Sequence, residues 1–162
     1  MAEINALDKD QVLFKPAPDA WSINEILEHL NKANESMRKV VISTLERAAS
    51  GKKVGTGRTD LAGVDILKRV VEDYSKPVEA PEIVRPLGKK DWEENLREFN
   101  AFFDRLFEDW PLFNEEELKR YVFPHPIYRK IDLMQWLWVI AGHCLFHLLQ
   151  IKDNKKSPDY PV

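Results

Sequence analysis

Residues 131–151, IDLMQWLWVIAGHCLFHLLQI, form the most apolar stretch of the 162-residue chain. A run of this length reaches the roughly 20 residues that a helix needs to span a membrane. It is nevertheless interrupted by five polar side chains: Asp132, Gln135, His143, His147 and Gln150. Buried polar groups need hydrogen-bonding partners, which a protein interior provides and a bilayer does not. The stretch therefore predicts the central helix of a helical bundle, with no association with a membrane.

Two histidines within this predicted helix, His143 and His147, are four residues apart. Residues at this spacing lie over the same face of a helix, so the two imidazoles can bind one divalent metal ion. Taken alone, the pair is better explained as two buried histidines with satisfied hydrogen bonds. Cys144 points about 100° away around the helix and is expected to be a small core residue. Cys144, Leu145 and Phe146 separate the histidines, so the glutamate of a metalloprotease HExxH motif is missing.

The other strong helix begins near Ser22, where Ser22 and Glu25 have the spacing of a capping box. Apolar residues then recur every three or four positions, which predicts an amphipathic helix to about Ala49. His29 lies at the edge of this apolar stripe. If the two helices are neighbours, His29 faces the histidine pair, and three protein ligands leave a fourth position for water or substrate. Imidazole ligands suit zinc and nickel about equally well.

The rest of the chain also predicts helices. A shorter helix is expected over 61–74, an extended proline-containing crossover over 76–86, and a helix with an aromatic stripe over 91–110. Residues 123–128 predict a turn, the last helix should begin at Asp132 behind a second capping pair, and the tail after Ile151 should fray. No strand-like alternation persists. The fold class is thus all-α, a single four-helix-bundle domain over residues 1–162.

Composition narrows the possible functions. The net charge of −3 and the absence of a basic stripe speak against nucleic-acid binding. The single cysteine excludes an intrachain disulfide and indicates a reducing compartment. The polar N-terminus lacks the pattern of a secretory signal, so a cytoplasmic protein is expected.

Two blocks of sequence resemble those of a known family. Residues 16–30, PAPDAWSINEILEHL, are similar to the opening motif of the DinB/YfiT-like superfamily. Its closing motif resembles Pro124-His125-Pro126, then Trp136, then Gly142-His143 to His147-Leu148 and Gln150-Ile151. Two features depart from the family pattern. Only about fifteen residues precede the first block, so the first helix is expected to be short or truncated, its place taken by the 61–74 helix or a partner chain. Arg129 stands where a glycine is common.

The resemblance implies a four-helix bundle with a three-histidine divalent-metal site, zinc or nickel being usual, with His29, His143 and His147 as the ligands. It also implies a homodimer and two possible chemistries on a small-molecule substrate. One is transfer to or from a low-molecular-weight thiol cosubstrate, and the other is metal-dependent hydrolysis. The alternative is a non-catalytic bundle with a vestigial or structural site, acting through dimerisation or ligand binding.

Further residues near the predicted site allow more than one interpretation. His125 is either an acid/base or pocket residue, or a turn histidine fixed by its neighbouring prolines. Gln150 shares the face of the histidine pair and either orients a ligand or bonds elsewhere in the bundle. Glu25 could orient His29, but its capping role already explains it. Trp136 and Trp138 are expected in the core.

Overall fold

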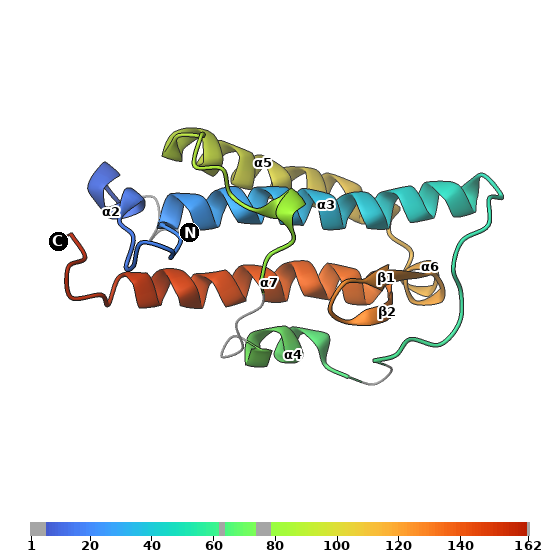
Figure 1. The fold of residues 1–162 in the computed structure, drawn as a ribbon. Coiled ribbons are helices and arrows are strands. Elements are labelled where there is room, and N and C mark those ends of the chain that lie inside the picture. Colours follow the sequence, from blue (N-terminus) through green and yellow to red (C-terminus); the bar gives the residue numbers. More distant parts are fainter. Residues whose placement is uncertain (1–5, 62–63, 74–78, 162) are drawn as a thin grey trace.

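The structure, a computed structural model, describes residues 6–61, 64–73 and 79–161. Its helices are α2 (Lys9–Leu13), α3 (Ile23–Ala49), α4 (Ile66–Glu72), α5 (Trp92–Asp109), α6 (Glu115–Arg120) and α7 (Leu133–Asn154). Two short 3₁₀ turns, η2 (Glu82–Val84) and η3 (Trp110–Leu112), and two strands, β1 (Val122–His125) and β2 (Arg129–Asp132), complete it (Figure 1).

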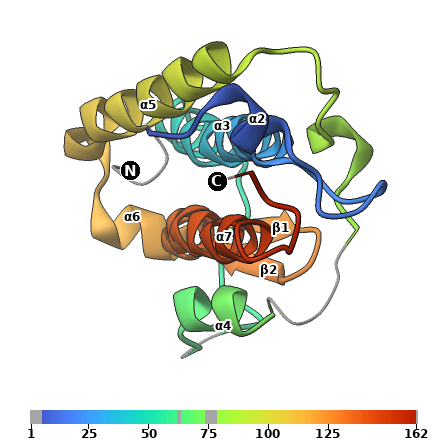
Figure 2. The same cartoon turned by 90° about the vertical axis from the view of Figure 1, so that its left-hand side faces the viewer.

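Helices α3 and α7 run antiparallel through the middle of the bundle, with α5 along α3 and α4 against α7 (Figures 1 and 2). This arrangement confirms the predicted all-α bundle. Both central helices begin at the predicted capping boxes, formed by Ser22 with Glu25 and by Asp132 with Gln135. The first described helix, α2, has five residues; residues 1–5 lie outside the described residues, so the expected short first helix stays a prediction.

Two apolar clusters hold α3 and α7 together. The first joins Ala33, Met37 and Val41 of α3 to Trp136 and Ile140 of α7, among other residues. The second joins the beginning of α3 to the end of α7 and to α5, through Ile23, Ile26, Leu27, Leu30, Phe99 and Ile151. Because the helices are antiparallel, positions 143 and 147 fall between the two clusters on α7, and position 29 lies beside Leu30, where the second cluster ends on α3. The apolar packing on either side fixes the place where the histidines meet.

The expectation that the chain has no strands was wrong. Residues 122–125 and 129–132 pair as an antiparallel hairpin, with Val122 opposite Asp132 and His125 opposite Arg129. Four-residue strands are too short to show a persistent alternating pattern. Arg129 has φ 59°, the left-handed conformation that commonly ends a three-residue hairpin loop and that favours glycine. Arg129, noted above as a departure from the motif that the sequence resembles, thus adopts a backbone conformation that favours glycine.

Other expectations need smaller corrections. Helix α4 is shorter than the predicted 61–74 helix; residues 62, 63 and 74 lie outside the described residues. Trp136 is buried as expected, whereas Trp138 is 49% exposed because it lies on the outer side of α7. The tail does not fray at Ile151: α7 continues to the buried Asn154, whose side-chain amide donates to the Trp21 carbonyl (2.9 Å).

Among the described residues, α7 is also the one helix long and apolar enough to cross a membrane by length and composition. A core helix passes the same test, and α7 packs against α3, α4 and α6.

Candidate metal centre

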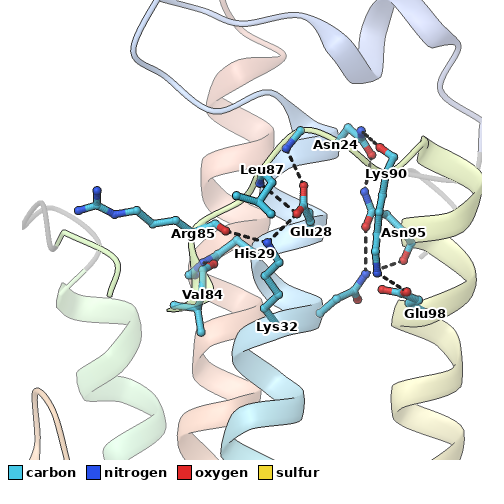
Figure 3. Close-up of polar contacts among 12 residues, drawn as sticks. Asn24, Glu28, His29, Lys32, Val84, Arg85, Leu87, Lys90, Asn95 and Glu98 are labelled. Carbon is cyan, nitrogen blue, oxygen red and sulfur yellow. Dashed lines mark hydrogen bonds and ion pairs between the residues drawn. The ribbon is translucent and has the colours of Figure 1, made fainter. Parts of the chain in front are cut away.

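His29 is positioned by a buried contact with the crossover between α4 and α5. Its side chain is only 4% exposed, and its Nδ1 lies 2.8 Å from the carbonyl oxygen of Val84 in η2 (Figure 3). Because a carbonyl oxygen can only accept, Nδ1 carries the hydrogen and donates it. Nε2 of His29 is then left as a lone pair, the form in which imidazole binds a metal.

Glu28, the residue before His29, attaches the same crossover to α3. Its carboxylate is buried and accepts hydrogen bonds from the backbone N–H groups of Leu87 (3.0 Å) and Gly88 (2.9 Å). It also forms an ion pair with Lys32 (2.7 Å), as Figure 3 shows. Burial alone would raise the pKa of the Glu28 carboxyl, but the bonds from Lys32, Leu87 and Gly88 outweigh it and lower that pKa. Glu28 therefore stays ionised and holds the crossover where Val84 can meet His29.

The other two imidazoles come from successive turns of α7. Nε2 of His143 lies 3.2 Å from Nε2 of His29 and 3.1 Å from Nε2 of His147. The three rings offer ligand atoms that all lie within 4.8 Å of one another, so the three histidines predicted from sequence come together. His147 Nδ1 lies 2.7 Å from Oε1 of Gln150, so Gln150 contacts a histidine of the cluster. That bond places the hydrogen of His147 on Nδ1 and leaves its Nε2 as a lone pair.

The donor set fits a divalent metal ion. The Nε2 lone pairs of His29 and His147 both point toward Nε2 of His143. If His143 carries its hydrogen on Nε2, that single hydrogen must serve both lone pairs. Zinc–nitrogen bonds of about 2.0–2.1 Å at tetrahedral angles put neighbouring ligand atoms roughly 3.3 Å apart. The observed 3.1 and 3.2 Å are close to that separation. Nδ1 of His143 is buried and has no hydrogen-bond partner among the described residues.

Burial keeps the three rings neutral near pH 7. Burial lowers the pKa of His29. It lowers the pKa of His147 to about 3, helped by the neighbouring His29. Burial, followed by repulsion from His147 and His29, lowers the pKa of His143 well below its ordinary value. Neutral imidazoles are the form that coordinates a metal, so protons do not compete for the site at neutral pH.

A cavity of about 520 Å³ opens onto the cluster. Its lining includes the three histidines and residues of α3, α4, α7, the crossover and the β1–β2 turn. His125 also lines it, in ring contact with Tyr128 and Trp136 at centroid distances of 4.9 and 4.7 Å. His125 thus lines the cavity and also belongs to the turn between β1 and β2.

Two further sequence-based expectations can be compared with this geometry. Glu25 caps α3 through the backbone N–H of Ser22 (2.9 Å) and pairs with Lys15, which confirms its capping role. Cys144 is directed elsewhere: its sulfur accepts a bond from Asn34 (3.4 Å), and burial raises its pKa to about 11. It is a partly buried thiol whose sulfur contacts Asn34, not a member of the histidine cluster.

Sequence reasoning missed the contribution of the crossover. The Val84 carbonyl leaves no trace in a sequence, because every residue has one. Glu28 did leave a signal: a charged residue beside the candidate ligand, with Lys32 four residues later, is typical of a helix ion pair. In the structure this ion pair lies against the crossover, and its Glu28 side chain is buried.

Comparison with known proteins agrees with this arrangement. The model of the DinB superfamily matches residues 2–151. The chain belongs to the DinB superfamily. It is 26% identical over 155 residues to the uncharacterized protein YuaE of Bacillus subtilis (strain 168), a match that covers 96% of this chain and 90% of YuaE.

Two solved structures share the fold. YfiT from Bacillus subtilis, described as a probable metal-dependent hydrolase with an unusual four-helix bundle topology, has a TM-score of 0.59 at 14% identity, covering 99% of this chain and 79% of YfiT. The four-helix bundle protein TT2238 has a TM-score of 0.52 at 15% identity, covering 92% of this chain and 85% of TT2238. At these identities the likeness shows the fold alone, and the bundle topology is the shared feature.

Proposed function

We propose that this protein is a divalent-metal-dependent enzyme whose ligands are His29, His143 and His147. The observation that carries the proposal is the convergence of three Nε2 atoms, two of them fixed as lone pairs by Val84 and Gln150. Imidazole ligands suit both zinc and nickel. A bound divalent ion supplies a positive charge that polarises a substrate oxygen or lowers the pKa of a bound water or thiol.

The reaction we favour is hydrolysis of a small molecule, in line with the description of YfiT as a probable metal-dependent hydrolase. The cavity of about 520 Å³ is of a size for a small molecule next to the histidines. Transfer of a low-molecular-weight thiol to an electrophile is the second chemistry that the same ligand set supports, because the nucleophile then comes from a cosubstrate. The chain itself offers no exposed thiol, since Cys144 is largely buried and bonded to Asn34.

Metal analysis of the purified protein tests the ligand set. We expect about one divalent ion per chain in the wild type, and loss of that ion in His29→Ala and His143→Ala. The fourth histidine provides a matched control, because His125→Ala should keep the metal. Protein that stays metal-free in zinc- or nickel-supplemented medium, or that keeps its metal after both substitutions, would favour the non-catalytic bundle.

An independent readout comes from the ring protons of His143. With metal at Nε2, the hydrogen of His143 must move to Nδ1; without metal, the hydrogen sits on Nε2 between His29 and His147. Long-range ¹H–¹⁵N spectra of metal-loaded and chelator-treated protein should show this exchange of tautomers. An unchanged His143 tautomer would contradict its role as an Nε2 ligand.

One assay with two kinds of substrate distinguishes hydrolysis from thiol transfer. Nitrophenyl esters report hydrolysis, and an aryl halide with glutathione or cysteine reports thiol transfer. We expect metal-dependent ester cleavage that is indifferent to added thiol. Turnover that requires both thiol and metal would assign the protein to the transferases.

We also propose that the protein is a cytoplasmic homodimer. The single reduced cysteine supports a reducing compartment. A second copy could cover the outer side of α7, where Trp138 and Leu145, seven residues apart, are both exposed. Light scattering of the wild type and of Trp138→Glu tests this interface: a dimer that becomes a monomer supports it, and a monomeric wild type overturns it.

A further inference from the structure

His125 is held in a single protonation state by the turn that contains it. Its Nδ1 accepts hydrogen bonds from the backbone N–H groups of Ile127 and Tyr128, each 3.1 Å long. An imidazole nitrogen that accepts two N–H groups has no hydrogen of its own, so the hydrogen of neutral His125 is on Nε2. Burial lowers the pKa of His125 to about 4, which keeps the ring neutral at pH 7.

The ring of His125 is also fixed in place. It stacks on Tyr128 with an interplanar angle of 26° and packs against the buried Trp136, whose Nε1 donates to the carbonyl of Phe123 in the same hairpin. His125 is close enough to the cluster that its charge would lower the pKa of His143. Its Nε2–H has no hydrogen-bond partner among the described residues. A rigid, neutral N–H donor therefore stands in the wall of the cavity.

This state decides which role His125 can take. A general base needs a free lone pair, and the only lone pair of His125 is already engaged by Ile127 and Tyr128. A general acid at pH 7 needs a pKa near that value, which burial prevents. What remains is a donor that binds an acceptor atom without changing its own protonation, as in an oxyanion-type site.

The other groups in the cavity restrict the charge of its ligand. No lysine or arginine is among the described residues that line it, so in metal-free protein these residues offer an anion no cationic side chain. Its two carboxylates already have partners: Asp73 pairs with Arg69 (3.3 Å), and Glu79 pairs with Arg85. The phenol of Tyr128 also stays neutral, because burial and then the charge of Asp73 raise its pKa to about 12. Most of the remaining wall is apolar, including Met37, Val40, Val70, Val139 and Phe146.

We propose that the cavity accepts a neutral, mainly apolar small molecule carrying a carbonyl-type oxygen, and that the Nε2–H of His125 donates a hydrogen bond to that oxygen. The proposal rests on the proposed function for the identity of the reacting site, but the binding step itself needs only residues of this chain. It adds a substrate class and assigns His125 as a donor that touches the substrate.

Two substitutions distinguish the donor role of the His125 Nε2–H from the role of its Nδ1 in stabilising the turn. In His125→Asn, the side-chain oxygen can replace Nδ1 as acceptor for the turn, as asparagine does in an Asx-turn, but the donor at the Nε2 position is lost. In His125→Gln, the amide nitrogen can reach the Nε2 position, while the acceptor for the turn is lost. A structural histidine would be replaced better by asparagine, and a donor histidine better by glutamine.

The test measures binding of N-phenylacetamide, a neutral carbonyl probe, to the full-length protein after chelator treatment, by NMR shift titration. Removing the metal ensures that it cannot attract the anionic control. We expect His125→Asn to weaken binding about tenfold with little change in Tm, the scale of one lost hydrogen bond. His125→Gln should bind within about threefold of the wild type despite a lower Tm. Benzoate, the anionic counterpart, should bind more weakly than the amide. Unchanged binding by His125→Asn, or tighter binding of benzoate, would overturn the proposal.

A spectroscopic readout keeps this test apart from the metal hypothesis. Long-range ¹H–¹⁵N spectra at pH 7 should show His125 with its hydrogen on Nε2, in metal-free and metal-loaded protein alike. A hydrogen on Nδ1 would overturn the donor assignment even if the metal site is real. Conversely, failure to find a metal would leave the binding of N-phenylacetamide and the tautomer of His125 as predicted.

Discussion

Substitution of Glu28 by glutamine tests whether the 79–88 crossover is part of the metal site. The carboxylate accepts from Leu87, Gly88 and Lys32 at 2.7–3.0 Å while almost fully buried. Glutamine offers one acceptor oxygen in place of two, and its NH₂ group would face a backbone N–H. Hydrogen bonds to charged groups contribute about 1.5–3 kcal/mol each. Since one bond and the ion pair are lost, we expect the free energy of unfolding to fall by about 2–4 kcal/mol.

The matched control lies two turns further along α3. Glu35 also forms ion pairs, with Arg38 (3.6 Å), Lys39 (4.0 Å) and Arg105 (3.4 Å), but it is partly exposed. Exposed ion pairs contribute roughly 0–1 kcal/mol, so Glu35→Gln should change the free energy of unfolding by less than about 1 kcal/mol. Urea unfolding of both variants at pH 7 gives the comparison. Equal losses in the two variants would refute a special role for Glu28.

The same variant should affect the metal. If the crossover shifts, the Val84 carbonyl no longer holds the Nδ1–H of His29, and loss of such outer contacts typically weakens metal binding about 10–100-fold. The pH dependence has a definite sign. Because the folded pKa of Glu28 is lowered, its stabilising effect is complete above the unfolded pKa and is lost as the pH falls through the folded value. Zinc affinity unchanged in Glu28→Gln, measured by competition with a chelator, would show that His29 does not depend on the crossover.

Three other substitutions have predictable effects on unfolding. Gly142→Ala should destabilise by about 1–3 kcal/mol despite alanine's higher helix propensity, because its Cβ would lie 2.8 Å from the Cβ of Val70 on α4; an increase in Tm would mean that α4 can move away freely. Arg129→Gly should stabilise by about 0.5–1 kcal/mol by relieving the left-handed backbone at φ 59°, and a lower Tm would refute this. The pKa of His125 is lowered to about 4, so the unfolded chain binds more protons than the native one between pH 4 and 6.5, and stability falls as the pH drops. The free energy of unfolding of the wild type should therefore fall between pH 7 and pH 5, and in His125→Asn this fall should be smaller by about 1 kcal/mol, after a discount for the partial exposure of the ring. Both proteins are measured after chelator treatment. An equal fall in the two proteins would contradict the lowered pKa of His125.

The parts of the fold that follow a local rule could be predicted from the sequence. The capping pairs at Ser22 and Asp132 and the apolar periodicity after them locate α3 and α7, and the spacing of His143 and His147 places two imidazoles on one face. His29 could be proposed as a third partner only on the assumption that α3 and α7 are neighbours. The β1–β2 hairpin was missed because four-residue strands carry too little pattern.

The orientation of the imidazoles could not be predicted, because it depends on groups without a sequence signature. A backbone carbonyl, that of Val84, fixes the hydrogen of His29. Two backbone N–H groups, those of Ile127 and Tyr128, fix the hydrogen of His125. Both contacts depend on where irregular segments lie after folding, and irregular segments follow tertiary packing rather than local propensity. Gln150, by contrast, is three residues from His147 on the same helix, so its contact could be anticipated.

The crossover and the β1–β2 hairpin contribute to the site in different ways. The crossover both holds His29, through Val84, and lines the cavity with Glu79, Ala80, Pro81 and Ile83. A change there alters the ligand set and the wall of the cavity together, so metal affinity and substrate preference should change as one. The hairpin lines the cavity through His125, Ile127 and Tyr128, and it makes no described hydrogen bond to the three clustered histidines. Sequence changes in residues 125–128 can therefore alter which molecule is bound while leaving the metal ligands in place, and this makes the hairpin the part of the site best suited to set specificity.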